Sequence, residues 1–280
     1  YVEKPPILDN VIDYDGNVAT NPDNEKFTNF EVGGSYRSGL VAVKGSYYNT
    51  QWKDRNLTKS VETGAGDSGD TDIIYLTGVN QSHSGVEVEA KVALHEMVEV
   101  DFAFSKGDWF FDGDAKGDYL EQEYNDDNQI IGQMTTEYTY ALNNLKVGDM
   151  PQTAYVGGLT LKPLAGLNLQ GLFRMYEDNY ADWSPDAREV EEDGADRAQV
   201  WKAPGYNKLD LHLSYKLPEI AGFDLTLHGH VFNALDNVYV QDATDNSKYN
   251  GYGDKLHLAH NAEVFLGTPR YYNLGLTVNF

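Results

Sequence analysis

Large apolar residues recur at every second position along many stretches of the chain. The clearest stretch is the end, where the apolar set is Tyr272, Leu274, Leu276, Val278 and Phe280. Small or polar residues stand between them. A period of two places successive side chains on opposite faces of a strand. The pattern therefore predicts a closing strand over 272–280 with one apolar face and one polar face.

Eight further stretches alternate in the same way and bring the expected number of strands to nine. The other eight ranges are 27–37, 40–54, 84–94, 98–111, 151–163, 167–181, 204–216 and 223–234. Each is about 10 to 15 residues long, enough to cross a bilayer at a tilt. Charged residues such as Glu87, Glu89 and Asp101 occupy the second face. Because buried charges are costly, this face must be wet.

The connections between these strands alternate strictly in length. Short turns are expected at 38–39, 95–97, 163–166 and 217–222, and long loops at 55–83, 112–150, 182–203 and 235–267. Transmembrane barrels have short turns at the periplasmic end and long loops outside. We therefore expect an all-β fold, a transmembrane antiparallel β-barrel.

The strand count is odd, whereas single-chain bacterial barrels have an even number. If the last strand ends in the periplasm, the first descends from outside, and residues 1–26 belong to an outer loop. The expected domain is thus the C-terminal part of a larger barrel, with strands and long loops over 27–280.

Charge and composition narrow the function. The formal net charge is −23, which disfavours nucleic acid and anionic lipid headgroups as partners. The acidic outer loops favour a ligand that is neutral, cationic or bound through divalent ions. There is no cysteine, no apolar run of transmembrane-helix length, and no secretory leader at the start. No nucleophile elbow, zinc-binding helix or phosphate loop is present, so the sequence does not predict an enzyme.

The alternation places three histidines on the wet face of their strands. They are His212, His228 and His230, on neighbouring strands. Hairpin geometry around the 217–222 turn places His212 near His228. Grouped imidazoles bind transition metals or metal chelates. The alternative is that they line a wet wall or hydrogen-bond to another part of the protein.

The candidate cofactor is Ca²⁺ in the acidic outer loops, best matched by residues 112–123. Asp112, Asp114, Asp118 and Glu123 stand at positions 1, 3, 7 and 12 of the twelve-residue calcium loop. Lys116 occupies a ligand position and no helices flank the segment, so a solvated acidic loop is the alternative.

Aromatic residues of the outer loops are candidate ligand contacts. They are Trp183, Trp201, Tyr249 and Tyr252. Exposed rings stack on sugars or chelates, and anchoring at the membrane interface is the alternative explanation.

Several segments together resemble one family. They are residues 27–33 (FTNFEVG), 47–54 (YYNTQWKD), 84–90 (SGVEVEA), 147–153 (VGDMPQT), 180–183 (YADW), 201–206 (WKAPGY), 231–239 (VFNALDNVY) and 269–280. In this order they are similar to the barrel of TonB-dependent outer-membrane receptors. The segments 180–183 and 242–245 (DATD) resemble the subgroup with an N-terminal carboxypeptidase-like regulatory domain.

The resemblance implies about nine strands of a 22-stranded barrel, with the plug domain absent from this chain. It also implies active, TonB-energised uptake of a metal chelate, cobalamin or glycan across the outer membrane of a Gram-negative bacterium. The implied partners are outer-membrane lipid, the TonB complex through the missing N-terminal part, and the barrel-assembly machinery, which reads the closing strand. Two alternatives remain: a self-contained small outer-membrane barrel, acting as a passive pore or surface enzyme, and a soluble carbohydrate-binding β-sandwich.

The parent protein should have a mass of roughly 80 kDa or more, with a plug before its first strand, because 22-stranded transporters carry a plugged lumen. Intact mass and N-terminal sequencing of the protein from a membrane fraction measure this. A parent no larger than the present chain would contradict the receptor interpretation.

Overall fold

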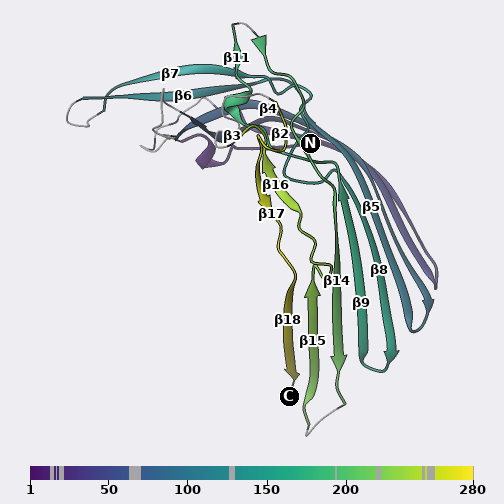
Figure 1. The fold of residues 1–280 in the computed structure, drawn as a ribbon. Helices are drawn as coiled ribbons and strands as arrows, with labels where there is room; N and C mark the ends of the chain where they lie inside the picture. The colour runs from purple at the N-terminus through teal and green to yellow at the C-terminus, as the bar shows by residue number, and fades with distance from the viewer. Residues whose placement is uncertain are drawn as a thin grey trace.

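A computed structural model describes residues 1–280 except 13–15, 17, 19–21, 63–70, 126–129, 193, 219–221, 248–249, 251–255 and 280. Its main feature is one antiparallel sheet in which neighbouring strands follow the chain (Figure 1). The nine long strands are β2 (Glu25–Arg37), β3 (Val41–Glu62), β4 (Thr71–His95), β5 (Val98–Phe111), β8 (Thr153–Leu164), β9 (Leu167–Glu177), β14 (Tyr206–Lys216), β15 (Asp224–Phe232) and β18 (Tyr271–Asn279). All nine predicted strands are thus confirmed, and the single sheet excludes a two-sheet sandwich.

We call the nine long strands of this sheet the wall. Shorter elements lie at one end of the wall. They are β1 (Val2–Lys4), η1 (Leu8–Asn10), β6 (Ala115–Tyr124), β7 (Ile130–Tyr140), β10 (Asn179–Tyr180), η2 (Pro185–Ala187), β11 (Val190–Glu191), β12 (Gly194–Ala195), β13 (Lys202–Ala203), β16 (Val240–Thr244) and β17 (Glu263–Leu266). In Figure 1 they gather at the top, while the tight turns and the C-terminus lie at the bottom. We call this upper layer, with residues 55–62 of β3 and 71–80 of β4, the rim.

The strand register aligns the apolar positions across the wall. Val43 lies opposite Ala90, which lies opposite Phe102, and the row continues through Gly157 to Phe173. A one-residue slip of any strand would turn its apolar set to the other face. Register and alternation therefore specify the same face on every strand.

This apolar face is exposed in the described chain. Leu274 is 83% exposed and Phe30 61%, and large apolar side chains of the other long strands are similarly uncovered. A soluble protein does not expose a contiguous apolar face of this extent. Lipid is the solvent that such a face requires, and closed barrels satisfy their backbone groups within it.

The opposite face carries charges that pair across the strands. Lys91 Nζ lies 2.6 Å from a Glu99 carboxylate oxygen, and Lys162 contacts the same carboxylate from the other side. Further along the wall, Arg174 pairs with Asp210. These ion pairs confirm the predicted wet face on β4, β5, β8, β9 and β14, where they lie on the positions between the apolar ones.

The long loops 55–83 and 112–150 are more structured than expected. β3 and β4 continue beyond the wall, and β6 and β7 form a hairpin in which β6 also pairs with β4. Residues 73–76, within the expected loop 55–83, belong to β4. Alternation fails to reveal these parts because both of their faces are covered: Ile74 and Leu76 on one face are fully buried, and Tyr75 on the other face is only 5% exposed.

A bulge separates the wall from the rim. The β3–β4 register shifts between Trp52 and Leu57, where Asp54 has a φ of 56°. On β4, Gly78 has a φ of 66°, a conformation that glycine adopts without strain. Bulges bend strands and increase their twist. The two strands therefore change direction as they enter the rim.

The buried apolar core of the described residues lies in the rim. Its members are Ile74, Leu76, Val79, Phe111, Ala115, Tyr140, Leu142, Leu145, Trp183 and Val200. They come from the rim ends of two long strands, β4 and β5, from the β6–β7 hairpin and from the connections that follow it. The wall below is a single layer with no second layer to pack against.

Residues 1–12 lie along the rim. Val2 pairs with Phe27 at the start of β2, and the Asn10 side-chain amide donates to the carbonyl of Asn56 at 2.8 Å. The Tyr75 hydroxyl donates to the carbonyl of Ile12 at 3.2 Å. This segment therefore joins the rim and not the wall.

Within the described ranges, the structure contains no helix that is long and apolar enough to cross a membrane.

The apolar face should be intolerant of charge. Leu211 lies on this face, and Leu211→Arg in the full-length protein should lower the unfolding free energy by about 2–4 kcal/mol near the bilayer midplane. Urea unfolding in lipid vesicles measures the change. Ser214→Arg, on the other face of β14, is the matched control and should have little effect. Equal losses for both variants would contradict the assignment of faces.

Candidate functional site

Three segments singled out in the sequence converge in the rim. The backbone N–H of Asp182 donates to the carbonyl of Ala243 at 2.8 Å, and the N–H of Asp245 donates back to the carbonyl of Asp182 at 2.7 Å. Segment 180–183 thus pairs in parallel with segment 242–245. A Cβ on Gly148 would lie 2.6 Å from the Asp182 nitrogen. Only glycine permits segment 147–153 to approach so closely.

Asp149 follows this glycine and has an unusual acidity. The residue as a whole is exposed, but its carboxyl group lies beside those of Asp182 and Asp242. Desolvation first, and then the negative charges and hydrogen bonding of these neighbours, raises the pKa of Asp149 to about 7. Lys59 opposes the rise and pairs directly with Asp182. The rim therefore holds a carboxyl group that changes charge near neutral pH.

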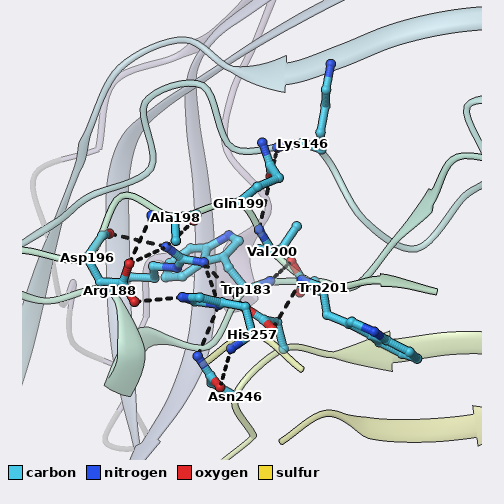
Figure 2. Close-up of polar contacts among 12 residues, drawn as sticks. Lys146, Trp183, Arg188, Asp196, Ala198, Gln199, Val200, Trp201, Asn246 and His257 are labelled. Carbon is cyan, nitrogen blue, oxygen red and sulfur yellow. Dashed lines mark hydrogen bonds and ion pairs between the residues drawn. The ribbon is translucent and has the colours of Figure 1, made fainter. Parts of the chain in front are cut away.

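A buried ionic network joins two connections of the rim (Figure 2). We define the rim network as Arg188, Asp196, Asp245 and His257. Arg188 is fully buried, and its guanidinium lies 3.3 Å from the carboxylate of Asp245 and 3.6 Å from that of Asp196. The guanidinium also donates to the backbone carbonyls of Asp196 and Ala198. These contacts supply partners for the two terminal nitrogens of the buried guanidinium, while its Nε has none.

His257 bridges the two aspartates. Its Nδ1 lies 2.5 Å from Asp245 and its Nε2 2.7 Å from Asp196. The hydrogen bond to Asp245, followed by that to Asp196, raises the pKa of His257, against burial and the nearby Arg188 charge. Protonated His257 therefore fastens the 178–205 connection to the 233–270 connection.

The predicted aromatic contacts differ in their surroundings. Trp183 is only 2% exposed and packs against Phe111 and Tyr140, with Lys59 Nζ 5.1 Å from the ring centre. The expectation of an exposed Trp183 is wrong, because the rim core covers it. Trp201 is half-buried, and in Figure 2 its ring points away from the rim network. Tyr249 and Tyr252 lie outside the described residues.

The expected calcium loop at 112–123 does not have the geometry of a loop. Residues 115–124 form β6, with Asp118 opposite Glu137 and Glu123 opposite Gly132. Asp114 is held by a bidentate pair with Arg197, at 2.9 and 2.7 Å. An extended strand cannot wrap these carboxylates and Asp112 around one ion. Hairpin pairing with β7, which no local motif indicates, overrides the partial match.

The three histidines do lie on the polar face, but their pairing differs from the prediction. His212 lies opposite His230, whereas His228 lies opposite Ser214 and contacts the Thr277 hydroxyl at 3.1 Å. The pairing of β14 with β15 continues as far as a hydrogen bond from the backbone N–H of Leu217 to the carbonyl of Leu225. The hairpin is therefore centred one residue later than expected, and the histidine register moves by two.

A pocket of about 210 Å³ lies in the rim. It is lined by Lys59, Ser60, Trp183, Ser184, Pro185, Asp186, Thr244, Ser247 and Glu263. Its volume is below the range of about 300–1,000 Å³ that accommodates drug-sized ligands. The described chain thus offers a part of a binding surface in the rim.

Sequence reasoning did not select Arg188, Asp196, Asp245 or His257. A signal was present, because segments 180–183 and 242–245 point to the same subgroup and meet in the structure. The contact between them predicts that their flanking charges meet as well. No periodicity marks those charges, since they lie outside the long strands.

Comparisons with known proteins show which family the chain belongs to. The family model described as "TonB dependent receptor-like, beta-barrel" matches residues 4–234. The chain belongs to this family. No curated protein matches it.

Solved structures of receptors resemble this barrel in fold. The copper transporter OprC is 14% identical, with a TM-score of 0.63, over 99% of this chain and 36% of that one. The ferric yersiniabactin uptake receptor FyuA from Yersinia pestis is 15% identical, with a TM-score of 0.57, over 92% and 31%. The ferric-catecholate import receptor Fiu from E. coli K12 is 13% identical, with a TM-score of 0.55, over 98% and 31%. The chain thus spans about a third of their length.

The rim of this receptor barrel should loosen as pH rises. The raised pKa of His257 gives a stabilisation that is complete below about 6.5, its ordinary value, and is lost as pH rises through the folded pKa. The raised pKa of Asp149 also makes the rim less stable as pH rises, and this second loss is complete above about pH 7. Hydrogen exchange of residues 181–188 and 240–246, corrected for intrinsic rates, should show less protection at pH 8 than at pH 6.

His257→Gln should remove much of this pH dependence, and Asp149→Asn the remainder. His95→Gln, at an exposed turn, is the control. An unchanged pH response in the double variant would contradict the role of these two groups.

Proposed function

We propose that the intact protein is an outer-membrane receptor of a Gram-negative bacterium that actively takes up a scarce ligand with energy delivered through TonB. The observation that carries the proposal is the family match over a wall that is apolar on one face and charged on the other. Such a wall separates lipid from a wet lumen. The plug and the segment that contacts TonB belong to the missing N-terminal part of the protein.

The ligand is a metal chelate in this proposal, with cobalamin or a glycan as the other classes. The three similar structures are named for a ferric catecholate, copper and ferric yersiniabactin, which favours the metal class. The net charge of −23 supports a neutral or cationic species, or one bound through divalent ions. Because the rim pocket is small, we infer that other parts of the protein complete the ligand site.

Two further partners follow from the wall. Outer-membrane lipid covers the apolar face, and the barrel-assembly machinery reads the closing strand. Tyr272, Leu274, Leu276 and Val278 all lie exposed on the apolar face of β18, as such a signal requires, and Phe280 lies outside the described residues.

Uptake by whole cells tests the function. Cells that express the full-length receptor should accumulate one of three probes, a neutral ferric hydroxamate chelate, cobalamin or a neutral oligosaccharide, and accumulation should stop when TonB is deleted. Accumulation without TonB would favour a passive pore. Failure with all three probes would contradict the proposed ligand classes. Tight, salt-independent binding of a polyanion would contradict the argument from charge.

A further inference from the structure

Two imidazoles face each other on the polar side of the wall. His212 on β14 and His230 on β15 are direct cross-strand partners, and their Nδ1 atoms lie 2.8 Å apart. The ring centres are 5.0 Å apart. One ring must donate a proton to the other at this distance, so the two nitrogens face each other between the strands, and a turn of each ring aims both at a common position beside the line that joins them.

A metal ion fits such a pair of nitrogens with little rearrangement. Metal–imidazole bonds are about 2.0–2.1 Å long, so two cis imidazoles on one ion hold their nitrogens roughly 3 Å apart. Replacing the shared proton with an ion therefore requires the nitrogens to separate by only a few tenths of an ångström. The backbone pairing of the two strands already supplies this arrangement.

Neighbouring aromatic rings hold the imidazoles in place. The Phe232 ring lies 5.5 Å from His212 and 5.9 Å from His230, and it stacks on Tyr271 at 4.6 Å. Residues whose rotamers are fixed by packing make better metal ligands than mobile ones. The pair is thus supported from the side, although no carboxylate orients it.

The described residues contain no group of three or more histidine or acidic side chains that could hold a metal. The nearest carboxylate along β14, that of Asp210, is bound by Arg174 and by the N–H of Asn233 at 2.8 Å. Gln170 and Asn273 flank the pair in the same row. A metal bound here would keep open positions for water or for the donor atoms of a chelate.

We propose that His212 and His230 form a two-imidazole site for a divalent first-row transition metal on the lumen wall. Affinity should be highest for Cu²⁺, as the general order for nitrogen ligands requires. The inference rests on the proposed function for its significance, since the site borders the expected uptake path. Binding itself is measurable without transport, so the two can fail separately.

Titration of the purified full-length receptor with Cu²⁺ alone tests the site. Electron paramagnetic resonance should show a copper signal with nitrogen ligands that the wild type has and that both His212→Asn and His230→Asn lack. Calorimetry should show the loss of one bound equivalent. His228→Asn is the matched control, since His228 lies on the same face without a histidine partner, and it should bind as the wild type does.

Circular dichroism and urea midpoints confirm that the variants are folded. Folded His212→Asn and His230→Asn receptors that bind copper as the wild type does would overturn the proposal. An equal loss in His228→Asn would also overturn it. Copper binding that requires both His212 and His230, but without TonB-dependent uptake of any probe, would support the site and contradict the proposed function.

Discussion

The structure depends on one constraint: a chain in contact with lipid must satisfy every backbone N–H and C=O group within the protein. The seven inner long strands meet it by pairing with a long strand on each side, as in the run from Leu211 to Lys216 against β15, whereas β2 and β18 lie at the two edges of the described wall. Because paired strands are extended, successive side chains point to opposite faces. The apolar residues therefore lie on one face of the wall and the charged residues on the other. The wall needs no buried core, because lipid takes the role of a second layer.

The rim follows a different principle, since water surrounds it and its stability must come from burial. It concentrates the apolar core around Trp183 and places a paired cation, Arg188, at zero exposure. A buried ion pair contributes little net stability against apolar replacements, yet removing one partner costs several kcal/mol. The network therefore specifies how two long connections meet.

The sequence was sufficient to predict the wall, because each strand there repeats a two-residue pattern and each turn is short. It could not predict the rim, where Ile74 and Leu76 read as a plain apolar run and the match at Asp112 read as a loop. Those residues are governed by pairing between segments far apart in the chain. The histidine site shows the same limit at smaller scale: alternation placed His212 and His230 on the correct face, but only the centre of the turn decides that they are partners. Trp183 was expected to be exposed because loops usually are, and it is covered by strands that alternation did not reveal.

The bulge at Asp54, opposite the backbone turn at Gly78, makes the register of the wall independent of the register of the rim. An insertion or deletion above it changes the rim while the bulge absorbs the odd residue, so the lipid-facing pattern below stays in phase. A change in the length of the rim therefore leaves the lipid-facing pattern of the wall unaltered.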